Sequence, residues 1–342
     1  MDLTSGHGPR TRVVVFGLGT VGKAAVRLCT TRRWIDVVGA VVRTSVGDRG
    51  IDGLSVSTDA TALLDERAPD VALIATRSTI AEVLPDIERC VGRGVNVICT
   101  SEELTYPAHE VREALETMAR DAGAVIAATG INPGFVFDAL PLAIAGAAWD
   151  VQRIQVSRSL DASVFGRSIH RSLGVGYDAA AFDEALAAHT IRGHIGFEES
   201  VNVIADAMGL VVTRFEESVA PLFADREYVL AEYRIEPGQT AGVKQRALAW
   251  VQGTDAALIE FDLSLHVAPG SAGIETMDRI RIEGENNVDL TIDPGTQAVL
   301  TTAARLVNTI PSVLRANPGF YAAADLLPSA PWLSNAPPPG AR

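Results

Sequence analysis

The sequence has few cysteines, few basic residues and no long apolar segment. Its 342 residues include three cysteines, Cys29, Cys90 and Cys99, each within an apolar run. This pattern is typical of reduced core thiols rather than of a disulfide framework. No stretch reaches about 18 uninterrupted apolar residues, so we expect no membrane span. Lysine and arginine total 29 against 42 acids, a net charge of −13, which disfavours nucleic-acid and membrane-surface partners.

Motifs of metal sites and of hydrolases are also missing. The six histidines and three cysteines form no HxxH or CxxC pair, so no metal site is indicated. No GxSxG motif occurs, and hydrolase chemistry is therefore not supported. The first ten residues are polar with two glycines, unlike a signal peptide. Together with the reduced thiols, this predicts a cytoplasmic protein.

The first half of the chain alternates buried strands with helices. Strands are expected at 12–16, 36–42, near 55, 71–76, 95–100 and 124–128, and helices at 20–31, from 59, 79–92, 108–121 and 135–147. Strands that do not alternate in polarity are buried on both faces, which is typical of a parallel sheet. The sequence therefore predicts the α/β class, with a doubly wound parallel sheet of the Rossmann type.

Strand patterns without intervening helices dominate the second half. Strands are expected at 151–160, 211–219, 228–235, 243–251, 257–267, 277–282 and 288–292, and helices at 178–189, 196–208 and 296–314. Such runs predict a second, α+β domain built on a mostly antiparallel sheet. We place the first domain at 1–148, completed by the C-terminal helix at about 296–328, and the second at 149–295. The tail from Ser329 is expected to be loop.

A glycine loop follows the first strand and opens the first helix: Gly17, Leu18, Gly19, Thr20, Val21 and Gly22. In this position GxGxxG is typical of dinucleotide binding. Gly17 permits the tight turn, Gly19 lets the backbone approach a pyrophosphate, and Gly22 allows close packing of helix and strand. The helix N-terminus would bind the phosphates. The alternative is a glycine-rich turn without a ligand.

The end of the second strand bears on the choice of cofactor. An acid that binds the ribose hydroxyls of NAD is expected there, but the sequence has Arg43 between Val42 and the hydroxyl residues Thr44 and Ser45. Guanidinium binds phosphate in a bidentate manner. We therefore predict that NADP(H) is preferred and NAD(H) is possible. A solvated loop arginine is the alternative.

Ligands of doubly wound sheets lie beyond the carboxyl ends of the strands. Besides the glycine loop and Arg43, the segments at those ends are 75–78, 100–103 and 129–134. Ala75, Thr76 and Thr100 are the cofactor candidates in the first two segments. Glu102 and Glu103 are the only carboxylates among them. A carboxylate there can stabilise a cation or move a proton. Alternatively, both acids cap the helix after Pro107.

Four segments carry a resemblance to a known family: NVICTSEELTYP at 96–107, TGINPG at 129–134, GHIGFEES at 193–200 and NTIP at 308–311. In this order they resemble the 2,4-diaminopentanoate dehydrogenase family, which includes the native amine dehydrogenases. The resemblance runs from about Val13 to Pro328. The wider relatives are dihydrodipicolinate reductases, whose His-His and Lys-centred catalytic segment is absent here, so their reaction is not carried over.

The resemblance implies a catalytic glutamate near the nicotinamide and a second domain that binds substrate and forms a homodimer. By motif the glutamate falls on Glu102 or Glu103. We favour Glu103, since the preceding strand directs it into the cleft. Asn132 and Pro133 would lie beside the nicotinamide, unless they form a simple turn. Candidates for the substrate pocket, each of which is otherwise a core residue, are Phe135, Phe137, Phe165, Tyr177, His194 and Phe197.

The activity implied is reversible NAD(P)-dependent amination of ketones or aldehydes with ammonia. One alternative is oxidation of 2,4-diaminopentanoate itself, whose carboxylate would need a partner such as Arg158 or Arg167. The other is a non-catalytic NADP-binding protein on the same fold. For the dimer, the strand 243–251 sets Lys244, Arg246 and Trp250 on one face. A tryptophan on a basic face favours an interface between sheets.

Overall fold

The computed structural model describes residues 10–44, 51, 53–191, 193–230, 234–326, 330–331 and 333. Ser45, Pro328 and Ser329, which the sequence interpretation names, lie outside the described residues. The chain divides into two compact units, Met1–Phe135 with Ala298–Arg342, and Val136–Gln297. Among the described residues, no helix has the length and apolarity needed to span a bilayer.

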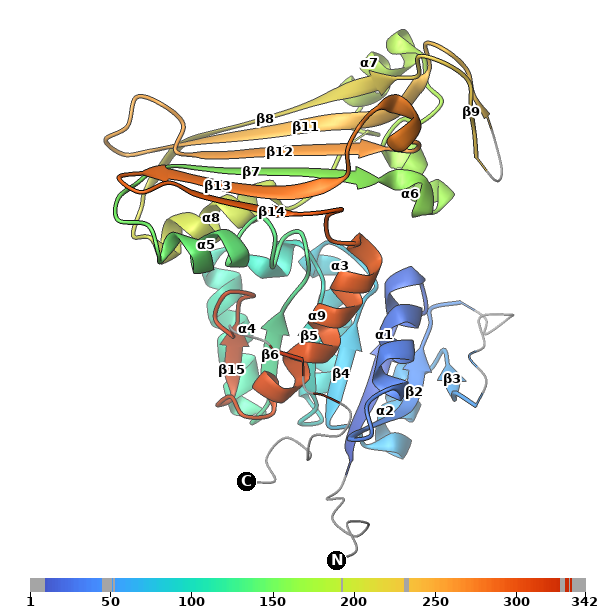
Figure 1. The fold of residues 1–342 in the computed structure, drawn as a ribbon. Coiled ribbons are helices and arrows are strands. Elements are labelled where there is room, and N and C mark those ends of the chain that lie inside the picture. Colours follow the sequence, from blue (N-terminus) through green and yellow to red (C-terminus); the bar gives the residue numbers. More distant parts are fainter. Residues whose placement is uncertain are drawn as a thin grey trace, which may run out of the picture. The chain divides into compact units, whose positions relative to one another are not determined.

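The first unit contains a seven-stranded parallel sheet, shown in Figure 1. Its strand order is β15-β6-β5-β4-β1-β2-β3, and every pair in it is parallel. The predicted doubly wound sheet is thus confirmed. The strands are β1 (Thr11–Phe16), β2 (Ile35–Val41), β3 (Val56–Ser57), β4 (Val71–Ile74), β5 (Asn96–Cys99), β6 (Val125–Ala128) and β15 (Gly319–Tyr321).

Helices cover both faces of this sheet, which explains why its strands are apolar throughout. One core contains Val14, Phe16 and Ile74, and the other contains Val13, Val15 and Leu73, because successive side chains of a strand point to opposite faces. The helices of the unit are α1 (Thr20–Thr30), α2 (Ala60–Arg67), α3 (Ile80–Val91), α4 (His109–Asp121) and α9 (Ala298–Val313), with a 3₁₀ turn η2 (Glu103–Thr105). Helix α9 packs beside α1.

The second unit is a six-stranded mixed sheet in the order β14-β13-β7-β12-β11-β8 (Figure 1). Only β7 and β12 run parallel; the other pairs are antiparallel, as predicted. The strands are β7 (Val151–Asp161), β8 (Val212–Phe223), β11 (Thr240–Val251), β12 (Ile259–His266), β13 (Met277–Gly284) and β14 (Val288–Ile292). Helices α5 (Ala139–Ala145) and α8 (Phe197–Ala207) pack on it. The remaining elements are η3 (Ala162–Val164), α6 (Arg167–Ser172), α7 (Ala179–Ala187) and η4 (Gly270–Ala272).

The single strand predicted at 228–235 is wrong. Two short strands, β9 (Tyr228–Val229) and β10 (Arg234–Ile235), pair with each other in a separate hairpin; residues 231–233 between them lie outside the described part. Tyr228 and Ile235 stand directly opposite one another and both are buried. Antiparallel pairing of the two short strands sets these two buried side chains next to each other.

The helix predicted at 135–147 is present, but it begins later than predicted, at Ala139. Helix α5 begins at Ala139, where the carboxylate of Asp138 accepts the backbone N–H of Ala139 at 2.5 Å. This helix packs on β7, β13 and α8 of the second unit. The boundary between the units accordingly lies at Phe135/Val136, earlier in the chain than the position 148 expected from the change of pattern.

Candidate active site

The glycine loop of the first unit has the tight geometry that its residues require. Gly17 has φ +90°, and a Cβ there would lie 2.7 Å from the carbonyl oxygen of Ala75. A Cβ on Gly22 would lie 1.8 Å from the carbonyl oxygen of Gly17. Both positions therefore exclude side chains. The space in front of Gly19, the N-cap of α1, is open within 4 Å, and no side chain caps this helix. The N–H groups at Thr20 and Val21 thus begin a helix whose N-terminus can take an anion.

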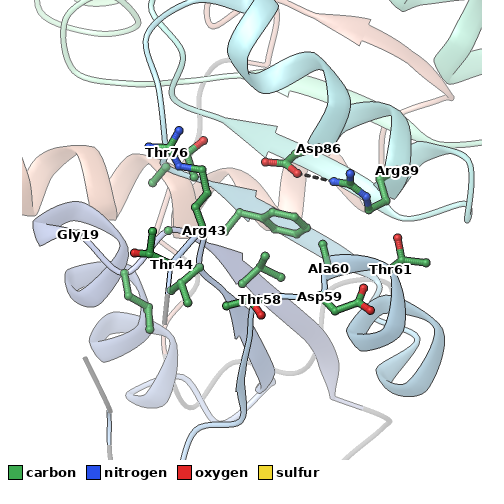
Figure 2. A pocket seen from close by; sticks show the side chains of 16 residues that line it. Gly19, Arg43, Thr44, Thr58, Asp59, Ala60, Thr61, Thr76, Asp86 and Arg89 are labelled. Carbon is green, nitrogen blue, oxygen red and sulfur yellow. Dashed lines mark hydrogen bonds and ion pairs between the residues drawn. The ribbon is translucent and has the colours of Figure 1, made fainter. Parts of the chain in front are cut away.

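A cavity of about 820 Å³ opens from this loop within the first unit, and Figure 2 shows the side chains around it. It extends along the carboxyl ends of β1, β2 and β4 to the start of α2 and to α3. This is the position that dinucleotides take in doubly wound sheets. The lining residues are Phe16, Gly17, Leu18, Gly19, Val41, Val42, Arg43, Thr44, Thr58, Asp59, Ala60, Thr61, Ala75, Thr76, Asp86 and Arg89.

The two arginines of this cavity differ in their bonding. Arg43 is exposed and makes no hydrogen bond or ion pair with another described residue, and its side chain extends toward Thr76 in Figure 2. Arg89 is held by Asp86 at 2.5 Å. The carboxylate of Asp59 accepts the N–H of Ala62 at 3.0 Å and caps α2. Arg43 is thus the cavity cation whose charge is not already balanced.

Three threonine hydroxyls follow β4, β5 and β6: Thr76 and Thr129 lie within two residues of a strand end, and Thr105 lies in η2. The Oγ1 atoms of Thr76, Thr105 and Thr129 are buried and have no hydrogen-bond partner among the described residues. A buried polar group without a partner is costly. Of the three threonines, Thr76 lines the cavity, where a polar ligand can bond to its hydroxyl. Sequence reasoning named Thr76 as a cofactor candidate and placed Thr129 in a segment at a strand end, but it missed Thr105. The place of Thr105 in η2, the turn that follows β5, was the available signal.

Glu103 lies in η2, which follows β5. Its Oε2 accepts the backbone N–H of Ile80 at 2.8 Å, and its own N–H donates to the carbonyl of Ser78 at 3.2 Å. The carboxylate therefore sits at the N-terminus of α3. The predicted alternative of capping the helix after Pro107 is wrong for Glu103: α4 begins after Ala108 without a side-chain cap.

Glu102 occupies the N-cap of η2 and, like Glu103, is half-buried. Its charge acts on Cys99, at the end of β5. Burial raises the pKa of the Cys99 thiol to about 12, and the negative charge of Glu102 adds to this effect. The thiol is therefore protonated and unreactive at neutral pH. The geometry brings both glutamates and Thr100 to one strand end.

The loop from Gly130 to Gly134 follows β6, and its two ends approach each other closely. A Cβ on Gly134, where φ is +118°, would lie 2.6 Å from the nitrogen of Gly130. A Cβ on Gly130 would lie 2.5 Å from the carbonyl oxygen of Pro133. The peptide between Asn132 and Pro133 is cis. The loop is thus a tight turn, the predicted alternative, and it also stands at a strand end where a ligand can reach it.

The predicted pocket residues fall into three groups. Phe137 and Phe197 are fully buried and pack with Phe261, with ring centroids 4.9 to 5.5 Å apart. Phe135 belongs to the first unit, with the guanidinium of Arg305 5.2 Å from its ring. Phe165 and Tyr177 are half-buried and lie between β7 and α7, without a ring contact to any described residue.

His194 joins the aromatic cluster of the second unit, 5.5 Å from the ring of Phe197. Burial lowers its pKa to about 4, and the positive charge of Arg158 adds to this effect. Arg158 is itself buried and lies 3.3 Å from Asp278, and it donates to the carbonyl of Thr296 at 2.7 Å. Burial also lowers the pKa of Arg158 to about 10, opposed by Asp278. Within the described residues no group of acids, cysteines and histidines suits a metal ion.

The fold and this cavity define the class of NAD(P)-dependent oxidoreductases, and homologues bearing dehydrogenase names support the same class. Residues 135–336 match the family of the 2,4-diaminopentanoate dehydrogenase C-terminal domain. The chain belongs to this family.

Two relatives align over nearly the whole chain. The 2,4-diaminopentanoate dehydrogenase of Acetoanaerobium sticklandii is 28% identical over 334 residues, which cover 93% of each chain. An amine dehydrogenase of Streptomyces virginiae is 22% identical and covers 92% of this chain and 95% of its own.

Solved structures share the fold. The amine dehydrogenase of Mycobacterium smegmatis superposes with a TM-score of 0.82 at 24% identity, covering 95% of this chain and 98% of its own. A dihydrodipicolinate reductase from Paenisporosarcina sp. TG-14 gives 0.53 at 14% identity, covering 93% and 100%. At these identities the likeness concerns the fold.

Proposed function

We propose that the protein is an NADP(H)-dependent amine dehydrogenase that reversibly aminates ketones or aldehydes with ammonia. The observation that carries the proposal is the half-buried Glu103 carboxylate, at the end of β5 in the same sheet whose β1, β2 and β4 ends form the dinucleotide cavity. The names of the two relatives, a diaminopentanoate dehydrogenase and an amine dehydrogenase, support an amine as substrate.

The residues present fit a dinucleotide. The backbone from Gly17 to Gly22 would hold the pyrophosphate, and the buried hydroxyl of Thr76 and the residues Ala75 and Thr100 would line its path. Asn132 and Pro133 would lie at the nicotinamide end. When bound, the cofactor supplies hydride in amination and accepts it in deamination.

The preference for NADP(H) over NAD(H) rests on Arg43. Its charge is not balanced by a described residue, and it lines the cavity with the hydroxyl of Thr44. A 2′-phosphate gives such a guanidinium two charge-assisted hydrogen bonds, and a 2′-hydroxyl does not. NAD(H) would bind less tightly through the glycine loop alone.

Glu103 would act on the proton balance of the reaction. Ammonium must lose a proton before its nitrogen attacks the carbonyl carbon. The same proton must then return to the hydroxyl of the adduct, so that water leaves and an iminium forms. A carboxylate can accept that proton and offset the iminium charge, an effect that is stronger in a dry site than in water. Hydride addition to the iminium carbon completes the amine.

A second candidate is oxidation of 2,4-diaminopentanoate, favoured by the name of the relative that is 28% identical. Its carboxylate needs a cation, but Arg158 already faces Asp278. Arg167, in α6, is exposed. A third candidate is a protein that binds NADP without catalysis.

One side-by-side assay separates the three. Purified protein with NADPH and ammonia is tested on cyclohexanone and a short aldehyde, and with NADP⁺ on 2,4-diaminopentanoate. Amination of the simple carbonyls supports the proposal, and selective oxidation of the diamino acid supports the second candidate. Tight NADPH binding without turnover of any of these substrates would favour the third candidate, a protein that binds NADP without catalysis.

We also propose a homodimer packed through the outer face of the second sheet. On this face Arg214 stacks over Trp250 at 3.5 Å, and Arg246 pairs with Glu260 at 3.3 Å. Aromatic residues and arginines are enriched at interfaces, and two-fold dimers are the commonest closed assembly. Light scattering should give twice the chain mass of 36.1 kDa; the monomer mass at micromolar concentration would refute the dimer.

A further inference from the structure

A polar residue is buried in the middle of β11, where its apolar neighbours form the core. Gln245 is 0% exposed and lies between Lys244 and Arg246, which are exposed on the opposite face. A buried amide is costly unless its hydrogen bonds are made. Gln245 makes three, and two of them go to the backbone of one residue, His194, which is distant in the sequence.

The amide of Gln245 holds His194 by both backbone groups. The N–H of His194 donates to Oε1 at 2.6 Å, and Nε2 donates to the carbonyl of His194 at 2.8 Å. Nε2 also donates to the carboxylate of Glu217. The side chain thus bonds His194 as a neighbouring strand would.

The preceding residue is fitted to this contact. Gly193 has φ +66°, and a Cβ there would lie 2.4 Å from Oε1 of Gln245. Any other residue would push the amide away from His194 or strain the backbone. The backbone conformation and the amide together fix where the His194 side chain leaves the chain.

The ring of His194 still has an unused polar atom. Its Nε2 is buried and has no hydrogen-bond partner among the described residues, although the ring packs against Phe197. The pKa of about 4, lowered by burial and then by Arg158, keeps the imidazole neutral at neutral pH. A neutral ring nitrogen can donate or accept one hydrogen bond, according to the tautomer.

We infer that Gln245 is a positioning residue that holds His194 so that its ring Nε2 offers one hydrogen bond to the neutral polar group of the substrate, an amine or a carbonyl. The inference rests on the proposed function for the identity of that group. The contact of Gln245 with His194 does not depend on it. Gln245 would act only through His194, which predicts that the two residues are coupled.

The test is a double-mutant cycle with Gln245→Met and His194→Leu. Each single variant should raise KM for the carbonyl about 5- to 150-fold, the range for one lost hydrogen bond with its partner left unpaired, with the Kd for NADPH unchanged. The double variant should be no worse than His194→Leu alone. Additive losses, or an unchanged KM in Gln245→Met, would overturn the inference. Gln252→Met, at an exposed residue directly after β11, is the control.

A second readout does not need turnover. In wild-type protein labelled with ¹⁵N-histidine, the signal of His194 is assigned by its loss in His194→Leu. Its chemical shift should remain that of a neutral imidazole down to about pH 4. In Gln245→Met the ring should move and its pKa should rise toward the ordinary value of about 6.5, whereas Gln252→Met should leave the signal unchanged. An unmoved signal in Gln245→Met overturns the positioning role, even if no carbonyl is turned over. Absence of turnover with an altered signal would instead count against the proposed function alone.

Discussion

The carboxylate of Glu103 has a structural contact that must be separated from its proposed chemistry. Its Oε2 accepts the N–H of Ile80 at 2.8 Å, at the first residue of α3. Replacement by alanine removes both the cap and the charge. Glu103→Gln keeps a carbonyl oxygen of the same reach for Ile80 but carries no charge and cannot accept the ammonium proton. The two variants therefore divide the two roles.

The expected magnitudes differ enough to decide. Loss of a capping oxygen costs about 0.5–2 kcal/mol, and loss of a negative charge at a helix N-terminus costs about 0.3–1 kcal/mol. Glu103→Gln should therefore lower Tm by about 1–4 °C and Glu103→Ala by about 2–12 °C, at about 2–4 °C per kcal/mol for a unit of this size. Both should lose about 10²–10⁴-fold in turnover, the usual contribution of an acid–base group.

The assay is NADPH oxidation with cyclohexanone and ammonia, beside thermal unfolding of the same samples. Glu102→Gln, in the same turn, is the control, and it should keep both turnover and stability. Near-full turnover in Glu103→Gln would refute the catalytic assignment. If Glu102→Gln were inactive instead, the role would pass to the neighbouring residue.

Three further outcomes are expected. Arg43→Ala should weaken NADPH binding about 10- to 150-fold in a fluorescence titration, the range for a hydrogen bond to a charged group, and should leave the affinity for NADH unchanged. An equal loss of affinity for both cofactors would contradict the 2′-phosphate contact. A similar loss of NADPH affinity in the control Arg27→Ala, at an exposed residue of α1, would contradict it as well. Asp278→Asn should cost about 3–5 kcal/mol in chemical denaturation because it leaves the charge of Arg158 buried, and a cost below about 1 kcal/mol would show that the pair is not stabilising. Finally, the pKa of His194 is lowered in the folded protein, so as the pH falls the unfolded chain takes up this proton before the folded chain does. The contribution of His194 to the free energy of unfolding is therefore complete above about pH 6.5 and is lost toward pH 4. His194→Gln should flatten the dependence of the unfolding free energy on pH in this range, and an unchanged slope would show that other groups cause it.

Most of the fold could be predicted because its signals are local. The buried strands from β1 to β6, the glycine loop and the helix at α9 each have a pattern within a few residues. Strand β15 has only three residues, too few for a pattern, and it forms because the carboxylate of Glu116 accepts the N–H of Phe320 and β6 pairs beside it. The hairpin at Tyr228 and Ile235 likewise depends on a contact across the chain.

The same distinction between local and long-range signals holds for the candidate site. The positions of Gly17, Gly22 and Arg43 follow from their spacing after two strands, which is a local property. The contact of Glu103 with Ile80 joins residues 23 apart, and Gln245 meets His194 across 51 residues. No periodicity in the sequence indicates either contact, because the residues meet only when helices, turns and strands pack in the tertiary structure.

The hydrogen bonds that a polar side chain makes, rather than its residue type, help to distinguish residues that stabilise the fold from residues that face a ligand. Arg158 and Arg43 are both arginines near the ends of strands, yet Arg158 is buried against Asp278 and Arg43 lines a cavity with its charge unbalanced. The same contrast holds for hydroxyls: Ser200 donates to Asp138 at 2.9 Å, whereas Thr76 has no described partner. Burial without a partner costs free energy that folding alone does not recover. Among the described atoms that bear this cost, Thr76 Oγ1 lines the cavity of the first unit and His194 Nε2 lies in the second unit. These are the two atoms at which we expect cofactor and substrate to bind.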